Sequence, residues 1–277
     1  MEVPVTDVAS VDARLAKLSQ RLAAILSDFI QRGLPPRRVA KLAGLLLLSK
    51  TRGDHVWAES AVEYLLQSQR SDGGWVDTED TAWAAFVIGA LSGRDKIYRR
   101  CLNWVLLQRS GQAWGYCPRD DPSIPSTSLV HFLLPEVADQ DSAVWLADAW
   151  EKDLWGPYRL SYKAAWFLLA RARGTAVGQL EERTVVHLRT DQRQDGGWGP
   201  WRDHPAPTDC FATGIAMTAL AETGSVAVAE VLHEAVGWAL ASQLPDGLFP
   251  THFIEEGSGW MLLGLSCAQR LMARGGP

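Results

Sequence analysis

Three carboxyl side chains lie within four consecutive residues, Asp77-Thr78-Glu79-Asp80. Carboxyl groups this close together cannot all ionise cheaply, so one of them can stay neutral and serve as a proton donor. The same residues also suit the start of a helix, with Asp77 or Thr78 as the N-cap and two acids in the first turn. A helix N-terminus favours the ionised carboxylate, which opposes the donor role. The sequence therefore leaves two interpretations open, a catalytic acid and a helix cap.

An internal repeat indicates which elements hold these acids. Gln69 to Trp75 reads QRSDGGW and Gln192 to Trp198 reads QRQDGGW, with weaker copies at 108–115, 243–249 and 154–156. In each copy a Gly can supply the positive φ that ends a helix, the Gln side chain can bond free backbone groups, and the Trp ring can cover the turn. We expect these residues to hold the structure together rather than to contact a ligand.

Each copy of the repeat separates two kinds of helix. The helix before it has one apolar stripe, and the helix after it is apolar nearly all round, as in residues 83–91, 211–220 and 260–265. Striped helices suit an outer layer and fully apolar helices a buried one. Residues 11–31 and 37–49 add a sixth pair, and the apolar helix 259–272 lacks the polar cap of an open solenoid. We predict an all-α fold, a single (α/α)6 toroid of two concentric helix rings over residues 1–277, closed by the hairpin 11–49.

Composition excludes several classes of protein. Hydrophobic residues make up 47% of the chain, charged residues 21%, and the net charge is −5. These values exclude a disordered chain and disfavour a polybasic nucleic-acid binder. Four Cys residues form no CxxC pair, and no run approaches the roughly 20 apolar residues of a membrane span or builds an export signal. We expect a cytoplasmic protein that binds an apolar small molecule and no nucleic acid.

The repeats resemble the QW repeats of class II squalene and diterpene cyclases and of protein prenyltransferase β subunits, and the resemblance covers essentially the whole chain. These proteins use α/α toroids. In the class II cyclases the middle acid of an Asp-x-Asp-Asp motif protonates an alkene or epoxide and starts a carbocation cascade. Asp77 to Ala82 is similar to the DxDDTA form of that motif, with Glu in the donor position. The resemblance implies that Glu79 is the acid, supported by Asp77 and Asp80.

A second candidate acid is Asp209. The pair Asp209-Cys210 resembles the Asp-Cys pair of oxidosqualene cyclases, in which the Cys hydrogen-bonds the donor acid, although Asp209 also suits a helix N-cap. The zinc site of protein farnesyltransferase β subunits would align with Thr208-Asp209-Cys210, but Thr208 replaces an Asp and residues 257–260 lack the expected His. We therefore expect no metal site of that kind.

Aromatic rings can stabilise a carbocation without supplying a nucleophile. The inner helices carry nine candidates for the cavity wall, and each could instead point into the layer between the rings: Trp83, Phe86, His131, Phe132, Tyr162, Trp166, Phe167, Phe211 and Trp260. For His131 the alternative is a buried, hydrogen-bonded side chain. Cations in the rim segments could hold a diphosphate or simply be solvated: Arg119, Arg159, Lys163, Arg202, His204 and His252.

Together these features predict a terpenoid cyclase of isoprenoid biosynthesis and secondary metabolism. It would be an isomerase or lyase that protonates an alkene or epoxide of a hydrophobic polyprenyl substrate, and it would be either soluble or peripherally associated with a membrane. No cofactor is expected unless the substrate is a diphosphate, in which case Mg²⁺ is implied; Asp120-Asp121 lacks the third Asp of a DDxxD magnesium motif. The alternatives are a non-catalytic isoprenoid- or lipid-binding module and an (α/α)6 carbohydrate-active enzyme, which would need a polar cleft with paired carboxylates.

Overall fold

The computed structural model describes residues 8–51, 55–157, 159–171 and 178–274, and within these ranges it contains helices and no β-strand. The ends of the expected domain, residues 1–7 and 275–277, lie outside the described residues. A short 3-10 helix, η1 (Val226–Val228), precedes the eleventh α-helix. The α-helices are α1 (Val8–Gln31), α2 (Pro36–Ser49), α3 (Ala58–Ser68), α4 (Thr78–Leu91), α5 (Lys96–Leu107), α6 (Ile124–Leu133), α7 (Gln140–Trp155), α8 (Ser161–Arg171), α9 (Gln179–Asp191), α10 (Cys210–Glu222), α11 (Ala229–Ser242) and α12 (Ser258–Arg274).

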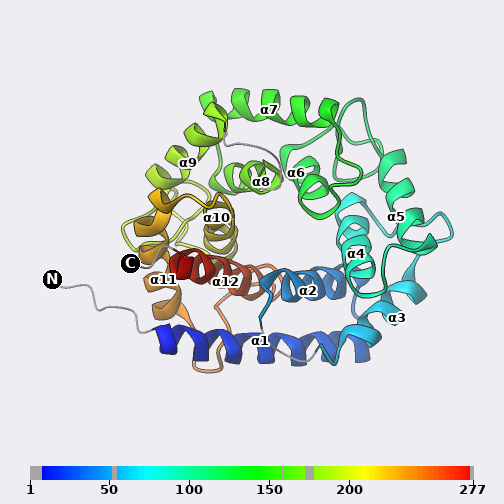
Figure 1. Ribbon diagram of the computed structural model, residues 1–277, viewed down its shortest axis with the longest axis horizontal. Coiled ribbons are helices and arrows are strands. Elements are labelled where there is room, and N and C mark those ends of the chain that lie inside the picture. The colour runs from blue at the N-terminus through cyan, green and yellow to red at the C-terminus, as the bar shows by residue number, and fades with distance from the viewer. Residues whose placement is uncertain (1–7, 52–54, 158, 172–177, 275–277) are drawn as a thin grey trace.

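The helices form two concentric rings, which confirms the predicted toroid. Figure 1 shows the even-numbered helices surrounding the centre and the odd-numbered helices outside them. Each inner helix contacts the next, and α12 packs against both α1 and α2, so that the first hairpin closes the ring. Arg270 Nη1 of α12 donates to the Ser49 carbonyl oxygen at 2.7 Å across this closure.

The two rings differ in how their helices are buried. The outer helix α5 buries one stripe, Tyr98, Cys101, Trp104 and Val105, against the inner ring. The inner helix α10 buries nearly every residue, because it packs against helices on several sides. Gly214 lets α10 and α12 approach closely, since a Cβ there would lie 2.5 Å from the carbonyl carbon of Trp260.

The repeated Gln and Gly-Gly-Trp residues join the outer helices to the turns that follow them. Gly196 has a φ of 93°, in the left-handed region that favours Gly. Gln192 Nε2 donates to the Gly196 carbonyl oxygen at 2.8 Å. The Trp198 ring is fully buried and its Nε1 donates to the Leu188 carbonyl oxygen of α9 at 2.9 Å. Gln69 bonds Gly73 in the same way, at 2.8 Å. These contacts stabilise the turn, as the sequence pattern predicts.

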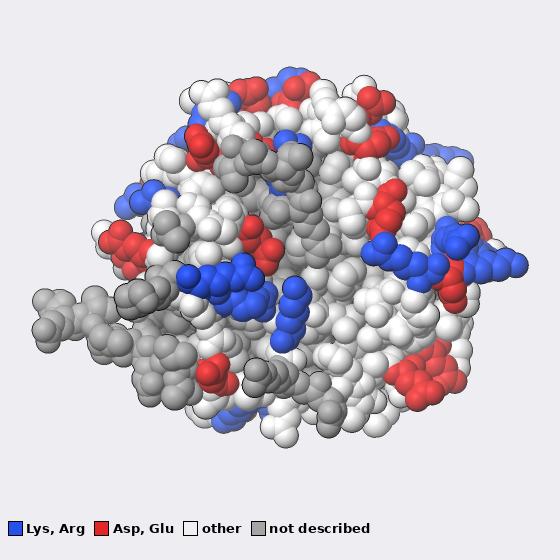
Figure 2. All heavy atoms as spheres, in the orientation of Figure 1, with Lys and Arg blue, Asp and Glu red and all other residues white. Residues whose placement is uncertain are grey.

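All inner helices begin at the same end of the ring, because each one follows an outer helix through a hairpin. The Thr78 backbone N–H donates to the Tyr116 carbonyl oxygen at 3.0 Å, which ties the start of α4 to the loop before α6. The opposing charges on the face shown in Figure 2 are interspersed, with no broad patch of one sign. Among the described residues no helix has the length and apolar character of a membrane span.

Candidate active site

A cavity of about 290 Å³ lies in the centre of the ring, at the end where the inner helices begin. Every inner helix contributes to its wall, together with the loops that carry Tyr116 and Glu256. The lining side chains are Arg37, Lys41, Glu79, Trp83, Tyr116, Pro125, Ser126, Leu129, Tyr162, Trp166, Phe211, Glu256 and Trp260. The wall is therefore aromatic on most sides and charged where α2 and α4 meet.

The aromatic part of the wall is organised around Trp260. Its ring makes edge-to-face contacts with Trp83, Trp166 and Phe211, at centroid distances of 6.2, 5.3 and 6.3 Å. Tyr162 extends the group through Phe211, at 6.4 Å. Five of the nine aromatic and histidine residues predicted from the sequence thus meet at one cavity. Their rings offer negative faces that suit a cation.

The charged part of the wall contains the carboxyl cluster, which we define as Asp77, Glu79 and Asp80. Asp77 is the N-cap of α4, and its Oδ1 accepts from the Asp80 backbone N–H at 2.8 Å. Asp77 and Asp80 are 3% and 5% exposed, and Glu79 lines the cavity. Asp77 is therefore the helix cap, and Glu79 is the member of the carboxyl cluster that faces the cavity.

Two cations from the first turns of α2 contact the carboxyl cluster. Arg37 Nη2 lies 2.5 Å from Glu79 Oε2, and Arg37 Nε lies 3.5 Å from Asp80 Oδ1. Lys41 Nζ lies 2.7 Å from Glu79 Oε1. Arg37 Nη1 also donates to the Tyr116 hydroxyl oxygen. Each carboxyl oxygen of Glu79 therefore lies within contact distance of a cation.

The carboxyl cluster nevertheless retains a proton near neutral pH. Burial, together with the charge of Asp77, raises the pKa of Asp80 to about 7. Burial also raises the pKa of Asp77, although the Asp80 backbone N–H and the Arg37 guanidinium oppose the increase. Asp80 Oδ1 is buried and accepts no hydrogen bond from the described residues. The charges of Asp77 and Glu79 both contribute to the raised pKa of Asp80.

A second, outer cavity of about 740 Å³ adjoins the first and shares four lining residues with it, Arg37, Lys41, Phe211 and Glu256. Its wall also contains Arg38, which lies 2.9 Å from Glu255 Oε2. The shared side chains form a partition between the two cavities.

Asp209 lies on the wall of the outer cavity, away from the carboxyl cluster. It is the N-cap of α10, accepts from the Ala212 backbone N–H at 2.8 Å, and has its pKa raised by burial. The Cys210 thiol bonds the Pro250 carbonyl oxygen at 3.4 Å. The hydrogen bond from Cys210 to Asp209 that the sequence resemblance implied is therefore replaced by a bond to the backbone.

Four predicted wall residues lie outside the lining of both cavities. His131 Nε2 and Ser142 Oγ of α7 share a hydrogen bond of 2.9 Å, and burial lowers the pKa of His131 to about 4. Phe167 stacks on Trp150 of α7, with a centroid distance of 5.9 Å. These two side chains point into the layer between the rings. Phe132 is buried and Phe86 is half-buried, and neither lines either cavity.

The rim cations predicted from the sequence also lie outside the inner cavity. Lys163 pairs with Asp153 at 2.7 Å, and Arg202 Nη1 donates to the Thr190 carbonyl oxygen at 2.9 Å. Arg119 and Arg159 line neither cavity, whereas His252 lines the outer one. Sequence reasoning missed Arg37, Lys41, Tyr116 and Glu256. A signal for Arg37 was present in its position along the helix. Arg37 and Glu79 both lie in the first turn of an inner helix, and these first turns meet at one end of the ring.

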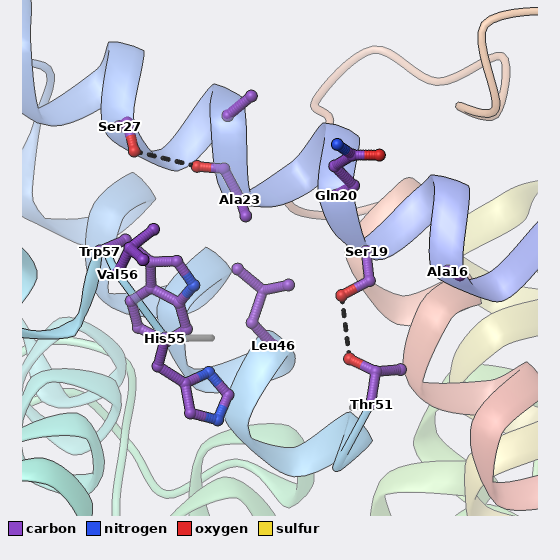
Figure 3. Close-up of a pocket in the computed structure, with 11 residues that line it drawn as sticks. Ala16, Ser19, Gln20, Ala23, Ser27, Leu46, Thr51, His55, Val56 and Trp57 are labelled. Atoms are coloured by element: carbon purple, nitrogen blue, oxygen red, sulfur yellow. Dashed lines mark hydrogen bonds between the residues drawn. The ribbon is translucent and has the colours of Figure 1, made fainter. Parts of the chain in front are cut away.

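A third cavity, of about 390 Å³, lies between α1, α2 and the segment that carries His55 and Trp57 (Figure 3). Its lining contains no carboxyl group, and Ser19 Oγ and Thr51 Oγ1 share a hydrogen bond of 2.9 Å within it. In the described part of the chain no three His, Cys, Asp or Glu side chains converge as a metal site requires. The carboxyl cluster and the aromatic wall therefore define the candidate active site.

Comparison with known proteins identifies the class of fold. No family model and no curated protein matches the chain. A solved structure of a protein from Actinoplanes superposes with a TM-score of 0.72 at 14% identity, over 95% of this chain and 99% of that one. The type II terpene cyclase MstE from Scytonema, in complex with its substrate geranylgeranyl dihydroxybenzoate, gives 0.71 at 15% identity, over 94% and 99%.

A third match is ent-copalyl diphosphate synthase from Streptomyces platensis, with a TM-score of 0.64 at 17% identity. It covers 86% of this chain but 50% of that one, so this chain corresponds to half of the larger enzyme. The chain thus has the α/α toroid fold found in type II terpene cyclases. Among these structures it matches MstE over nearly the full length of both chains.

Proposed function

We propose that the protein is a terpenoid cyclase that starts a carbocation cyclisation by protonating an alkene or epoxide of a polyprenyl substrate. The observation that carries the proposal is the carboxyl cluster, in which Glu79 faces an aromatic cavity and burial raises the pKa of the adjacent Asp80 to about 7. The fold shared with MstE supports it, because that enzyme binds a geranylgeranyl compound as its substrate. The reaction leaves the mass unchanged or adds water, as in an isomerase or a hydratase.

The first step is a proton transfer from Glu79 to the substrate. Asp80, whose pKa burial raises to about 7, is the source of the proton, and Arg37 and Lys41 pair with Glu79. The proton has to pass to Glu79, the member of the carboxyl cluster that lines the cavity. The π electrons of the substrate alkene then form the new C–H bond, Glu79 becomes a carboxylate, and the neighbouring carbon becomes a cation.

The following steps need a cavity wall that stabilises the carbocation without supplying a nucleophile that would quench it. Trp83, Trp166 and Trp260 supply aromatic faces around the cavity. Each ring closure moves the cation along the chain, and loss of a proton or addition of water ends the cascade. Glu79, now a carboxylate, can also offset the positive charge electrostatically.

The charges around both cavities favour an uncharged substrate. Arg37, Arg38 and Lys41 each pair with a carboxylate already, and the carboxyl groups of the two linings outnumber their Arg and Lys side chains. A diphosphate would have to break these pairs and lie beside the remaining carboxylates, which is unfavourable. We therefore favour a neutral polyprene, prenyl alcohol or epoxide, a substrate that gives Mg²⁺ no diphosphate to bind.

The test is incubation of the purified protein with squalene, oxidosqualene, geranylgeraniol, a geranylgeranylated phenol and geranylgeranyl diphosphate, followed by mass spectrometry. We expect isomers or hydrates from a neutral compound. Glu79→Gln removes the transferable proton and should lower turnover by about 10² or more. Glu59→Gln, the same change at an exposed site on α3, should leave turnover unchanged. Full activity in Glu79→Gln would remove Glu79 from the mechanism.

The ion pairs of Glu79 favour a second candidate, a non-catalytic isoprenoid-binding module. Arg37 and Lys41 contact both carboxyl oxygens of Glu79, which leaves neither oxygen free to pass a proton to a substrate. Binding of geranylgeraniol, followed by quenching of Trp fluorescence, without product from any polyprenyl compound would support this alternative and exclude the cyclase.

A further inference from the structure

One buried ammonium group is shared by two carboxylates from distant parts of the chain. Lys41 lies on the inner helix α2 with its side chain 5% exposed. Its Nζ lies 2.7 Å from Glu79 Oε1 and also forms an ion pair with Glu256 Oε1 in the loop before α12. A buried ammonium needs such partners, because burial alone would favour its neutral form. The two carboxylates raise the pKa of Lys41 against this effect of burial.

Lys41 also occupies a specific place in the site. It lines both cavities and forms part of the partition between them, together with Arg37, Phe211 and Glu256. Lys41 and its ion pairs with Glu79 and Glu256 therefore lie where the two cavities adjoin. A shift of Lys41 toward Glu256 would leave Arg37 as the cation that contacts Glu79.

The charged groups around Glu79 come from four elements. Arg37 and Lys41 face it from α2, and Asp77 and Asp80 lie beside it on α4. Tyr116, from the loop before α6, contacts it through Arg37. Glu256, from the loop before α12, contacts it through Lys41. Of the two cations that contact Glu79, Lys41 also pairs with Glu256, a carboxylate outside the carboxyl cluster. The other carboxylates near Arg37, Asp77 and Asp80, belong to the cluster.

We propose that Lys41 is a positioning residue that controls the protonation of the carboxyl cluster, and that Glu256 regulates it by drawing Lys41 away from Glu79. The inference rests on the proposed function, in which a protonated cluster starts the reaction. Lys41 stabilises the carboxylates, so a closer Lys41 makes the cluster release its proton at lower pH. Glu256 competes with Glu79 for Lys41 and so weakens this stabilisation. The cluster then keeps its proton to a higher pH. Lys41 itself transfers no proton to the substrate.

The test is a pH titration of the carboxyl cluster in protein labelled with ¹³C at the Asp and Glu carboxyl carbons. The signals that disappear in Glu79→Gln and Asp80→Asn identify the cluster. Lys41→Met should raise the midpoint of the titration by about one pH unit. Glu256→Gln should lower the midpoint by about half a unit, because Lys41 then pairs with Glu79 alone.

Two further variants separate this mechanism from a general charge effect. Glu255→Gln removes the neighbouring carboxylate, which pairs with Arg38 instead of Lys41, and should leave the midpoint unchanged. In the double variant Lys41→Met, Glu256→Gln, the effect of Glu256 should disappear, because it acts through Lys41. An undiminished effect of Glu256 in the Lys41→Met background would overturn the proposal, as would an unchanged midpoint in Lys41→Met.

The titration requires no turnover, so it remains informative if the protein forms no terpenoid product. If Lys41→Met does not fold, the comparison of Glu256→Gln with Glu255→Gln decides: equal midpoints refute the inference. A purely structural role of the ion pair would lower the melting temperature of the variants without moving the midpoints in opposite directions. In an active enzyme the alkaline limb of the pH profile of kcat should move with the midpoint of each variant.

Discussion

Replacing Asp80 by Asn should stabilise the protein at alkaline pH. Asp80 is 5% exposed, and burial raises its pKa to about 7, compared with about 3.9 in an unfolded chain. Between these two values the folded state binds a proton that the unfolded state has lost. The free energy of unfolding therefore falls as the pH rises from about 4 to about 7. Above pH 7 the folded state bears the full cost of a buried carboxylate.

The magnitude follows from the difference between the two pKa values. About three pH units at 1.36 kcal/mol each give about 4 kcal/mol, which is an upper bound because Asp77, whose pKa is also raised, can bind a proton in place of Asp80. Asn carries no charge at any pH and avoids this cost. We expect Asp80→Asn to gain about 2 kcal/mol over the wild type at pH 8 and nearly nothing at pH 4.

The measurement is urea unfolding of the wild type and of Asp80→Asn at intervals from pH 4 to pH 8. Other buried groups titrate in this range, among them His131, whose lowered pKa has the opposite effect on stability. The difference between the two proteins cancels such contributions. A difference that does not change with pH would refute the assignment of the proton to the carboxyl cluster, and so would a variant less stable than the wild type at pH 8.

Three further substitutions test the fold and the assignment of the acid. Trp198→Ala should lower the free energy of unfolding by about 3–5 kcal/mol in urea, because it removes a buried ring and the donor to Leu188. Gly214→Ala should cost about 1–3 kcal/mol and lower the melting temperature, because its Cβ would lie 2.5 Å from the Trp260 carbonyl carbon. Asp209→Asn keeps a capping side chain and should leave turnover within about twofold; loss of product in this variant, with activity retained in Glu79→Gln, would move the acid to the outer cavity.

The arrangement of the helices could be predicted because the burial of each helix corresponds to a local pattern of apolar residues in the sequence. An outer helix such as α5 needs one apolar stripe, whereas α10 is enclosed on all sides and is apolar all round. The turn residues carry a second local signal. Gly196 is needed where φ is positive, and Gln192 bonds that same turn. Both signals depend on neighbours within one hairpin.

The direction of single side chains could not be predicted in the same way. Trp166 lines the cavity, while the adjacent Phe167 stacks on Trp150 of the outer ring. The sequence of a helix that is apolar all round does not indicate how the helix is rotated about its own axis. The hydrophobic pattern therefore does not show which of Trp166 and Phe167 faces the cavity. That rotation is fixed by packing against both rings at once.

The ion pairs of the acid also escaped prediction, for a different reason. Glu79 contacts Arg37 and Lys41 from another hairpin, and Lys41 contacts Glu256 from near the other end of the chain. No spacing along the sequence relates these residues. What relates them is that all inner helices begin at one end of the ring, which becomes evident once the toroid is known.

The closure of the ring affects the order in which the site can form. Lys41 comes from the first hairpin, whereas Glu256 immediately precedes α12, the last helix. During synthesis on the ribosome the first hairpin emerges long before its neighbour α12 exists, and it has no second partner to pack against. Such a long-range closure slows folding, since much of the chain must be ordered before the contact forms. Lys41 can therefore pair with Glu79 as soon as α4 has formed, but it acquires Glu256, its second carboxylate partner, only when the chain is nearly complete.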